Sequence, residues 1–392
     1  MRHLPKILFF LSLCTLPLHA VELGIDVLQK NNFDLLLGKR VGLVTNQTGV
    51  NSAGEKTRLI LKRHVNLVAL YTPEHGLDGT EKAGVEVRSR RDPLTGLTAY
   101  SLYGDTRKPT PRMLAGVDVL VYDMQDIGCR SYTYISTMGK CLQACAEQGK
   151  EFVVLDRPNP IGGNRVEGQG IDPQWISFVG QFPVPYVHGM TVGELALMAN
   201  AKGWMGPKAN LQVVRMRGWS RDMTWPMTGL RWVPPSPNIP NEMSPNYYVI
   251  TGEVGELAGG LDQGLFSPHA FQVLGAHWMK PLMVTYLRSR CPGIHVDPTT
   301  TSCGPGVIFH CNPSGGGDLA AAALYTLAEC NRQSHGLIFS QASKTKLNLF
   351  AKVYGSDAIR RQLASLRPEQ IVASWQPFLS RFRSDRQPYL LY

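Results

Sequence analysis

A carboxylic acid and an imidazole that could carry out proton transfer stand side by side in the chain, at Glu74 and His75. They stand in the turn 73–76, directly after the apolar run 67–71. That run has the length of a buried strand, so Glu74 and His75 are predicted to follow the C-terminal end of a strand. Ligands of open α/β sheets bind at this position. The pair suits general acid–base catalysis, although an ordinary solvated turn holds the same residue types.

Three further apolar runs, 40–45, 117–122 and 152–155, end in polar residues in the same way. Helical patterns at 56–64 and 134–148 separate these runs, and the alternation predicts a parallel, right-handed βαβ sheet. Parallel strands place their C-terminal ends on one edge, so we expect a polar cleft there. The polar residues that follow the three runs are Asn46 and Gln47, then Asp123, Gln125 and Asp126, and finally Asp156, Arg157 and Asn159.

Other polar and aromatic residues are candidates for the walls of this cleft. Arg130, Tyr132 and Tyr134 follow the third cluster and would add a cation and aromatic rings. His188 comes just before a helix that is predicted from an N-capping pattern. A buried structural histidine is an equally good interpretation of His188.

Nucleotide-binding, serine-hydrolase and metalloprotease motifs are missing from the sequence. It has no Gly-x-Gly-x-x-Gly after the first strand, no P-loop lysine, no Gly-x-Ser-x-Gly and no His-Glu-x-x-His. We therefore expect no cofactor and no metal; carboxylates, amides and aromatic rings suit a carbohydrate. Glycoside hydrolysis uses two carboxyl groups, about 5–5.5 Å apart in retaining enzymes and about 6.5–9.5 Å apart in inverting ones. Glu74 and Asp123, on neighbouring strand ends, are candidates for this pair.

The length of the chain predicts two domains, and its first twenty residues predict export. A chain of 392 residues is too long for a single hydrophobic core of ordinary size. The proline-rich segment 232–240 predicts a division into domains 21–233 and 234–392. Residues 1–20 combine a positive start with an apolar run, which is typical of a secretory signal peptide and predicts a periplasmic or secreted location. No other segment is apolar enough for stable membrane insertion. The formal net charge is +10, but no basic run with interleaved aromatic residues indicates nucleic acid.

A series of motifs in a fixed order carries a family resemblance. The motifs are Thr72-Pro73-Glu74-His75-Gly76, Ser101-Leu102-Tyr103-Gly104, Arg107-Lys108-Pro109-Thr110-Pro111, Asp123 to Asp126, Tyr132-Thr133-Tyr134-Ile135, Leu155-Asp156-Arg157-Pro158-Asn159-Pro160, Val187-His188-Gly189-Met190-Thr191-Val192-Gly193-Glu194 and Pro234-Pro235-Ser236-Pro237-Asn238. In these the chain resembles the NamZ-like exo-β-N-acetylmuramidases, long catalogued as a domain of unknown function. The resemblance implies a Rossmann-like N-terminal domain, a smaller α+β C-terminal domain and a cleft between them.

The resemblance also implies an activity, the release of terminal β-N-acetylmuramic acid from the non-reducing ends of peptidoglycan fragments. Glu74 would be the catalytic acid, and Asp123 or Asp126 would act as base, nucleophile or orienting group. His75 and His188 would tune these groups or bind substrate. The basic residues Arg130 and Arg157 would face the lactyl carboxylate of the sugar. The other expected substrate-binding residues are Asn46, Gln125, Tyr132, Tyr134, Asp156, Asn159 and Asn238.

The segment 251–260 departs from the family pattern. Family members carry a Phe-Glu-Gly-Thr-Asn type segment and then an Arg-Gly-Thr turn, whereas this chain lacks the Thr-Asn pair and the arginine. Its own acids there are Glu253 and Glu256. An exported peptidoglycan-binding protein without catalysis is therefore the alternative on the same fold. A metal-dependent hydrolase that uses Glu74, His75 and Asp123 is the third hypothesis.

Overall fold

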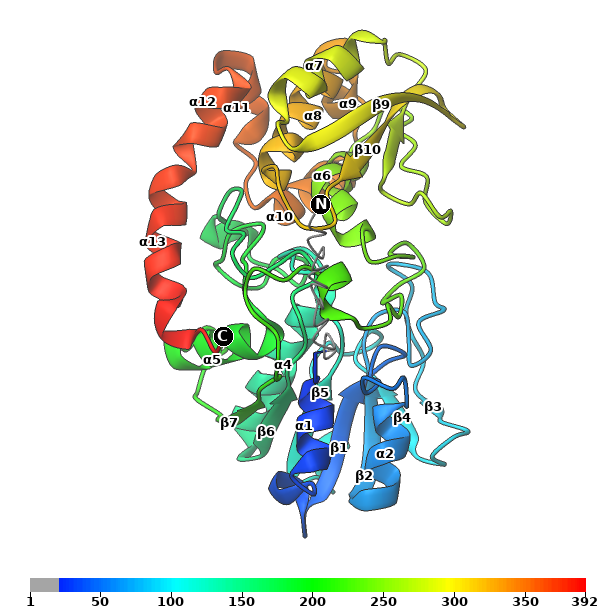
Figure 1. The fold of residues 1–392 in the computed structure, drawn as a ribbon, viewed down its shortest axis with the longest axis vertical. Helices are drawn as coiled ribbons and strands as arrows, with labels where there is room; N and C mark the ends of the chain where they lie inside the picture. Colours follow the sequence, from blue (N-terminus) through cyan, green and yellow to red (C-terminus); the bar gives the residue numbers. More distant parts are fainter. Residues whose placement is uncertain (1–20) are drawn as a thin grey trace, which may run out of the picture.

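A seven-stranded sheet organises the N-terminal half of the chain in the computed structural model, which describes residues 21–392 (Figure 1). The strand order is β3-β4-β2-β1-β5-β6-β7, and every neighbouring pair is parallel except β3 with β4 at one edge. This confirms the predicted parallel βαβ sheet. The strands are β1 (Arg40–Thr45), β2 (Asn66–Thr72), β3 (Arg90–Arg91), β4 (Thr98–Ser101), β5 (Val119–Asp123), β6 (Glu151–Leu155) and β7 (Asn210–Val214).

Alternate residues of the central strands pack on opposite faces of the sheet. Val121 and Val153 belong to the hydrophobic core that also holds residues of α1 and α2. Their neighbours Tyr122 and Val154 belong to the core that holds residues of α4 and α5. Because both faces are covered, these strands read as continuous apolar runs. The helices of this half are α1 (Gly24–Lys30), α2 (Thr57–His64), α3 (Pro111–Leu114), α4 (Thr133–Gln148) and α5 (Val192–Lys202), with short 3₁₀ turns η1 (Asp34–Leu36), η2 (Pro173–Trp175) and η3 (Trp225–Thr228).

The predicted ends of two helices are confirmed. α4 ends at Gly149, which takes a left-handed φ of 62° that a residue without a side chain adopts at no steric cost. α5 begins with the predicted capping pair. The Thr191 hydroxyl accepts the Glu194 N–H at 3.2 Å, and the Glu194 carboxylate accepts the Thr191 N–H at 3.0 Å.

The segment 82–112 is polar and turn-rich, a composition that predicts a long functional loop, but the structure shows strands in it. β4 lies within it and pairs in parallel with β2, and β3 pairs with β4, so the sheet extends two strands beyond β2. β4 has only four residues and β3 only two, and their flanks are polar, so the hydrophobic pattern did not indicate them. The expected signal peptide, 1–20, lies outside the described residues.

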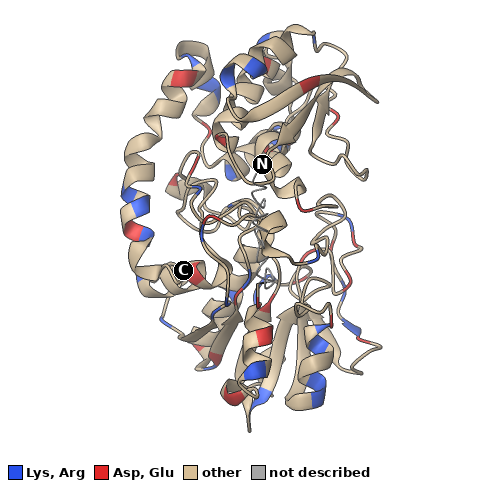
Figure 2. Ribbon diagram, viewed as in Figure 1, with Lys and Arg blue, Asp and Glu red and all other residues tan. Residues whose placement is uncertain are grey.

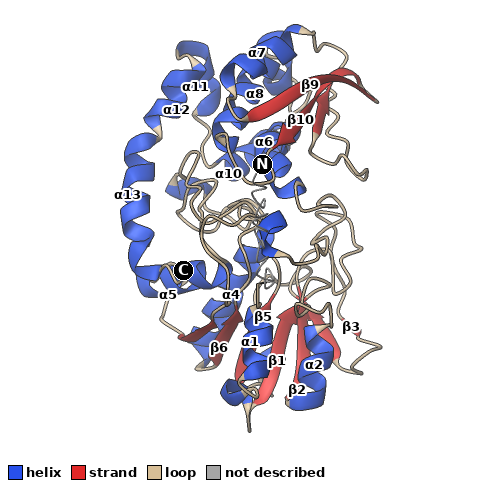
Figure 3. Cartoon of the chain, in the orientation of Figure 1, coloured by secondary structure: helices blue, strands red, loops and turns tan. Residues whose placement is uncertain are grey.

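The C-terminal half combines a small antiparallel sheet with helices (Figures 1 and 3). The sheet has the order β8-β10-β9, and α6 packs against α8 beneath it. Its elements are α6 (Ser244–Gly255), β8 (Val273–Gly275), α7 (Leu282–Arg290), β9 (Ile294–Thr301), β10 (Gly304–Cys311), α8 (Leu319–Gln333), α9 (Leu337–Ser340), α10 (Lys344–Tyr354), α11 (Ile359–Ser365), α12 (Pro368–Ser374), α13 (Gln376–Arg386) and η4 (Gln387–Tyr389).

The end of the chain returns to the first sheet. α13 runs from the C-terminal half back to α5 (Figure 1). The Tyr392 hydroxyl then donates to Asp156 at 2.8 Å, and the Leu391 N–H donates to Glu194 at 2.8 Å. Lys and Arg residues are distributed through both halves, with acidic residues between them (Figure 2). None of the helices within 21–392 is both long and apolar enough to cross a bilayer.

Candidate active site

The end of β2 turns Glu74 and His75 out of the sheet. β2 stops at Thr72, and Pro73 follows, which has no N–H to continue the ladder. His75 and Gly76 then take positive φ values of 68° and 78°, and the chain reverses. A left-handed backbone at a residue other than glycine is uncommon and concentrates at functional sites.

Two donors hold the Glu74 carboxylate. Its Oε2 accepts the Thr133 hydroxyl at 2.7 Å, and its Oε1 accepts the Gly84 N–H at 2.8 Å. Thr133 is the first residue of α4, so the carboxylate lies at the positive end of a 16-residue helix. The two hydrogen bonds fix the position of the carboxylate.

Glu74 lines a cavity of about 560 Å³ between the two halves of the molecule. This volume falls within the ~300–1,000 Å³ typical of ligand sites. The lining residues of the N-terminal half are Glu74, His75, Ala83, Gly84, Tyr103, Ser131, Tyr132, Thr133, Val179 and, from the proline-rich segment, Ser236, Asn238 and Ile239. The C-terminal half contributes Tyr248, Gly252, Gly255, Glu256, Gln263, Leu265, Phe271, Leu349 and Val353. The cleft that the resemblance implied is therefore present.

His75 presents one ring nitrogen for a further contact. Its Nδ1 lies 2.7 Å from the backbone carbonyl oxygen of Glu81. Because a carbonyl oxygen only accepts, Nδ1 carries the proton and Nε2 is the unprotonated nitrogen of the neutral ring. His75 is thus fixed in one tautomer beside Glu74.

Three tyrosines, Tyr103, Tyr132 and Tyr248, line the cavity. Tyr132 and Tyr248 meet edge to face, with ring centroids 5.9 Å apart, and the Tyr248 hydroxyl lies 3.1 Å from the Ser131 hydroxyl. Burial raises the pKa of both tyrosines, and burial together with the Glu74 carboxylate raises the pKa of Tyr103. All three phenols therefore remain protonated donors at neutral pH.

Four of the predicted site residues meet at this cavity, namely Glu74, His75, Tyr132 and Asn238. Asn238 Oδ1 accepts the Phe266 N–H at 2.7 Å, which fixes the amide group. The other predicted residues lie among buried polar contacts outside the cavity lining.

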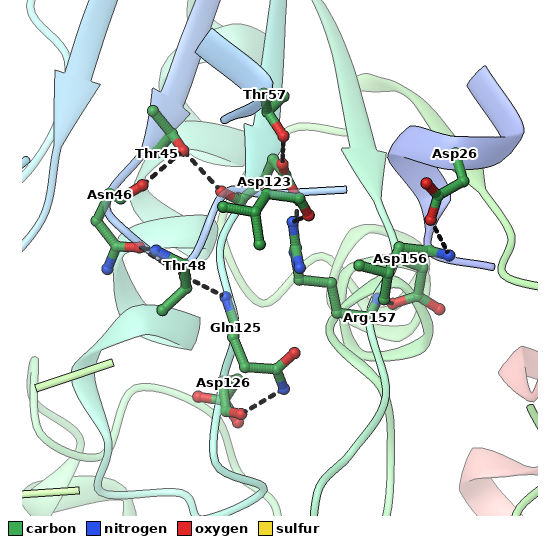
Figure 4. Close-up of polar contacts among 12 residues, drawn as sticks. Asp26, Thr45, Asn46, Thr48, Thr57, Asp123, Gln125, Asp126, Asp156 and Arg157 are labelled. Atoms are coloured by element: carbon green, nitrogen blue, oxygen red, sulfur yellow. Dashed lines mark hydrogen bonds and ion pairs between the residues drawn. The ribbon is translucent and has the colours of Figure 1, made fainter. Parts of the chain in front are cut away.

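Asp123 is fully buried and paired rather than facing the cavity (Figure 4). Its Oδ1 accepts the Arg157 Nε–H at 2.6 Å, and its Oδ2 accepts the Thr57 hydroxyl at 2.5 Å. Arg157 also donates to the Val50 carbonyl at 2.7 Å. Asp123, the expected second carboxylate, and Arg157, one of the expected lactyl-binding cations, therefore form a buried ion pair with each other.

Asp126, Gln125 and Asn46 lie in the same buried layer (Figure 4). Gln125 donates to the carbonyls of Asp126 and Pro158, both at 2.8 Å, and Asn46 accepts the hydroxyl and N–H of Thr48. Burial raises the pKa of Asp126 to about 7, and its Oδ1 has no hydrogen-bond partner within 21–392. Gln125 and Arg157 line a separate, smaller pocket of about 150 Å³.

Arg130 is wholly buried and joins the two halves of the molecule. Its guanidinium donates to four backbone carbonyls rather than facing the cavity. The four acceptors are Gln169 at 2.9 Å, Val184 at 2.8 Å, Val353 at 3.3 Å and Tyr354 at 2.7 Å. Residues 353 and 354 belong to α10, so Arg130 anchors that helix to loops of the N-terminal half.

The remaining predicted residues also have internal partners. Asp156 accepts the hydroxyls of Thr191 and Tyr392 at 2.7 and 2.8 Å, and burial together with Glu194 raises its pKa to about 6. Asn159 donates to the Met190 carbonyl at 3.1 Å. These residues hold the start of α5 and the chain end in place.

His188 and Tyr134 likewise lie outside the cavity lining. His188 is 1% exposed, its Nδ1 accepts the Met190 N–H at 3.2 Å, and burial lowers its pKa to about 3. The Tyr134 hydroxyl donates to the Pro235 carbonyl. His188 occupies the buried structural position that was the alternative interpretation.

Several lining residues were not among the predicted site residues. Tyr103, Thr133 and Ser236 belong to the motifs of the family resemblance, so that series contained a signal for them. Tyr248 and Gln263 lie in α6 and the loop after it, where no local pattern indicated a site. Within 21–392, no group of three or more His, Cys, Asp or Glu residues is placed to hold a metal ion.

Comparisons with known proteins match both halves of the chain. A family model described as "Exo-beta-N-acetylmuramidase NamZ, N-terminal" matches residues 41–243, and its C-terminal counterpart matches residues 247–392. The chain is 38% identical to "Peptidoglycan beta-N-acetylmuramidase NamZ" of Bacillus subtilis (strain 168), over 95% of this chain and 91% of that protein.

Two solved structures, both DUF1343 family proteins from Bacteroides fragilis NCTC 9343, share the fold. One is 42% identical with a TM-score of 0.88, and the other is 28% identical with a TM-score of 0.73. Each comparison covers 95% of this chain and 99% of the other.

Proposed function

Because this chain belongs to the NamZ exo-β-N-acetylmuramidase family, we propose that it hydrolyses peptidoglycan fragments and releases terminal β-N-acetylmuramic acid from their non-reducing ends. The observation that carries this proposal is the position of Glu74. Its carboxylate lies in the cavity between the halves, held by Thr133 and Gly84. A fixed carboxyl group in a cavity of this size suits acid–base catalysis on a sugar.

The rest of the cavity lining is chemically suited to a carbohydrate. Hydroxyl and amide groups of Ser131, Ser236, Asn238 and Gln263 can bind sugar hydroxyls and the acetamido group. Tyrosine and phenylalanine rings supply apolar faces. The lining contains no lysine or arginine, so we propose that neutral donors bind the lactyl carboxylate, in place of Arg130 and Arg157.

We further propose that the protein works outside the cytoplasm. Peptidoglycan lies there, and residues 1–20 have the composition of a secretory signal. A periplasmic or secreted location would bring the cavity to its substrate.

The test is hydrolysis of the disaccharide MurNAc-β-1,4-GlcNAc by the purified protein. We expect the wild type to release both sugars and Glu74→Gln, which keeps the side-chain size, to release neither. Glu81→Gln, an exposed position on the same loop, is the matched control and should keep full activity. Equal thermal unfolding of all three proteins would show that the loss is chemical.

Two outcomes would contradict the proposal. Full activity in Glu74→Gln would remove this residue from the mechanism. Binding of the disaccharide by the wild type without turnover would instead favour the non-catalytic peptidoglycan-binding alternative, which the divergent segment 251–260 motivates.

A further inference from the structure

The pocket of about 150 Å³ at the edge of the seven-stranded sheet is a site of its own, because it shares no lining residue with the cavity that holds Glu74. The proline-rich segment separates the two, since Pro234 lines the pocket and Ser236 lines the cavity. Gln47 holds this partition in place, because its Nε2–H group donates to the carbonyls of Pro234 and Pro235 at 2.7 and 2.9 Å.

The pocket lies where the connections of the sheet change direction. β1 continues through α2 to β2 on one side, whereas β5 continues through α4 to β6 on the other side of β1. In open α/β sheets, ligands bind in the crevice outside the strand ends at such a switch point. Thr48 and Val50 follow β1, Gln125 follows β5 and Arg157 follows β6, and all four line this switch-point pocket.

Arg157 brings a cation with a free edge to the switch-point pocket. The side chain is only 3% exposed, its Nε–H donates to Asp123 at 2.6 Å and its Nη2–H donates to the Val50 carbonyl at 2.7 Å (Figure 4). Its Nη1 has no hydrogen-bond partner among residues 21–392. One edge of a buried guanidinium is therefore left for a ligand.

Arg231 supplies a second cation to the lining. It is exposed, and its side chain has no hydrogen bond or ion pair with the described part of the chain. The lining residues of the described chain include no Asp or Glu. Asp26 contacts two of them, but its carboxylate already accepts the Leu23 N–H at 2.8 Å and the Ser52 N–H and hydroxyl at 3.1 and 2.9 Å. Because Asp123 offsets the charge of Arg157, the uncompensated charge of the lining is that of Arg231.

Two buried polar atoms of the lining residues also lack a partner within 21–392. They are Gln125 Oε1 and Trp225 Nε1. A buried polar atom without a hydrogen bond is costly, and bound water or a ligand can supply the missing partner.

The remaining walls of the pocket are apolar and leave room for a small molecule. Trp225 and Trp232 meet edge to face with ring centroids 4.9 Å apart, and Val50 and Val233 lie in the same lining. A cavity of roughly 150 Å³ accommodates a body of the size of benzene. The lining therefore suits a ligand that combines a small apolar body with an anionic group.

We propose that the switch-point pocket binds a small organic carboxylate, with its apolar body against the tryptophan and valine walls and its carboxylate on Arg157 Nη1 and Arg231. A guanidinium offers parallel N–H donors that match the two oxygens of a carboxylate. The carboxylate belongs either to a free acid or to the end of a short peptide. The inference goes beyond the proposed hydrolysis and does not depend on it.

The test is isothermal titration of the purified protein with benzoate and with benzamide, which has nearly the same size and no charge. We expect saturable binding of benzoate and at least roughly tenfold weaker binding of benzamide. Arg231→Gln should weaken the binding of benzoate at least roughly tenfold. Arg217→Gln, an exposed arginine that does not line the pocket, is the matched control and should keep the affinity within about twofold.

A second probe, N-acetyl-D-alanyl-D-alanine, separates the two sources of the carboxylate. Binding of benzoate alone would indicate a free acid, and binding of the dipeptide would indicate the end of a peptide. Binding of neither probe would overturn the inference, and so would equal affinity for benzoate and benzamide. Unchanged affinity in Arg231→Gln would place the benzoate elsewhere, and an equal loss in both arginine variants would reduce the effect to general surface charge. If Arg231→Gln folds poorly, Arg231→Lys keeps the cation and should retain the preference for benzoate over benzamide.

Discussion

Thr133 and Glu74 are separated by 59 positions in the chain, yet the Thr133 hydroxyl donates to Glu74 Oε2 at 2.7 Å. The contact joins the turn after β2 to the first residue of α4. The hydrogen bond holds the carboxylate in one position at the cavity wall. Without it, the Glu74 side chain could rotate between several positions. Precise placement of a reacting group contributes strongly to rate.

Removing the Thr133 hydroxyl should lower kcat strongly and the stability of the fold only slightly. Thr133→Val keeps the shape of the side chain and removes the hydroxyl, and we expect kcat to fall roughly tenfold to a hundredfold. Steady-state kinetics on the disaccharide would measure the change. Thr133→Ser, which keeps the hydroxyl, should stay close to the wild type. A loss of similar size in both variants would show that the methyl group, not the hydrogen bond, matters.

Arg130 should act on the fold rather than on substrate binding. Arg130→Met fills the same space but leaves four buried carbonyls without a donor, so we expect the free energy of unfolding to fall by at least about 3 kcal/mol. Urea unfolding would measure it, with Arg130→Lys as the variant that keeps a cation and part of the hydrogen bonding. Unchanged stability with lost binding of muramic acid would instead support the role expected from the sequence.

The Asp123–Arg157 ion pair should behave as a buried structural pair. Asp123→Asn removes one charge and leaves the Arg157 guanidinium buried at 3% side-chain exposure, so we expect a clear fall in melting temperature with kcat of the folded enzyme nearly unchanged. Combining it with Arg157→Met should recover part of that stability, because no lone charge remains. A fall in kcat of about a thousandfold at unchanged stability would identify Asp123 as a catalytic carboxylate after all.

His188 should make stability depend on pH below neutrality. Burial, Arg386 and Arg130 lower its pKa to about 3, against about 6.5 in the unfolded chain. The unfolded state therefore binds more protons, and the stabilising contribution is complete above pH ~6.5 and is lost as the pH falls toward 3. Between pH 6.5 and 5 the wild type should lose about 2 kcal/mol more than His188→Gln. Urea unfolding at both pH values would measure the difference, and equal slopes would contradict the buried neutral state.

Local patterns of the sequence predicted the elements that are built from local interactions. The strands at 40–45 and 67–71 follow from continuous apolar runs, and the start of α5 follows from the Thr191–Glu194 spacing. The turn that carries Glu74 was also predictable, because Pro73 ends the strand and Gly76 permits the reversal. These features depend on residues within a few positions of each other, which the chain displays directly.

Only the tertiary structure decided which polar residues face the cavity. Glu74 follows β2 and Asp123 ends β5, and the two acids look equivalent in the sequence. The expectation that they stand on neighbouring strands was wrong, because β1 lies between β2 and β5. Thr57 and Arg157 bind the Asp123 carboxylate inside the protein, whereas Glu74 reaches the cavity. The opposite wall, with Glu256, comes from the other half of the chain. The direction of a side chain and its hydrogen-bond partners depend on residues far away along the chain, so no local pattern specifies them.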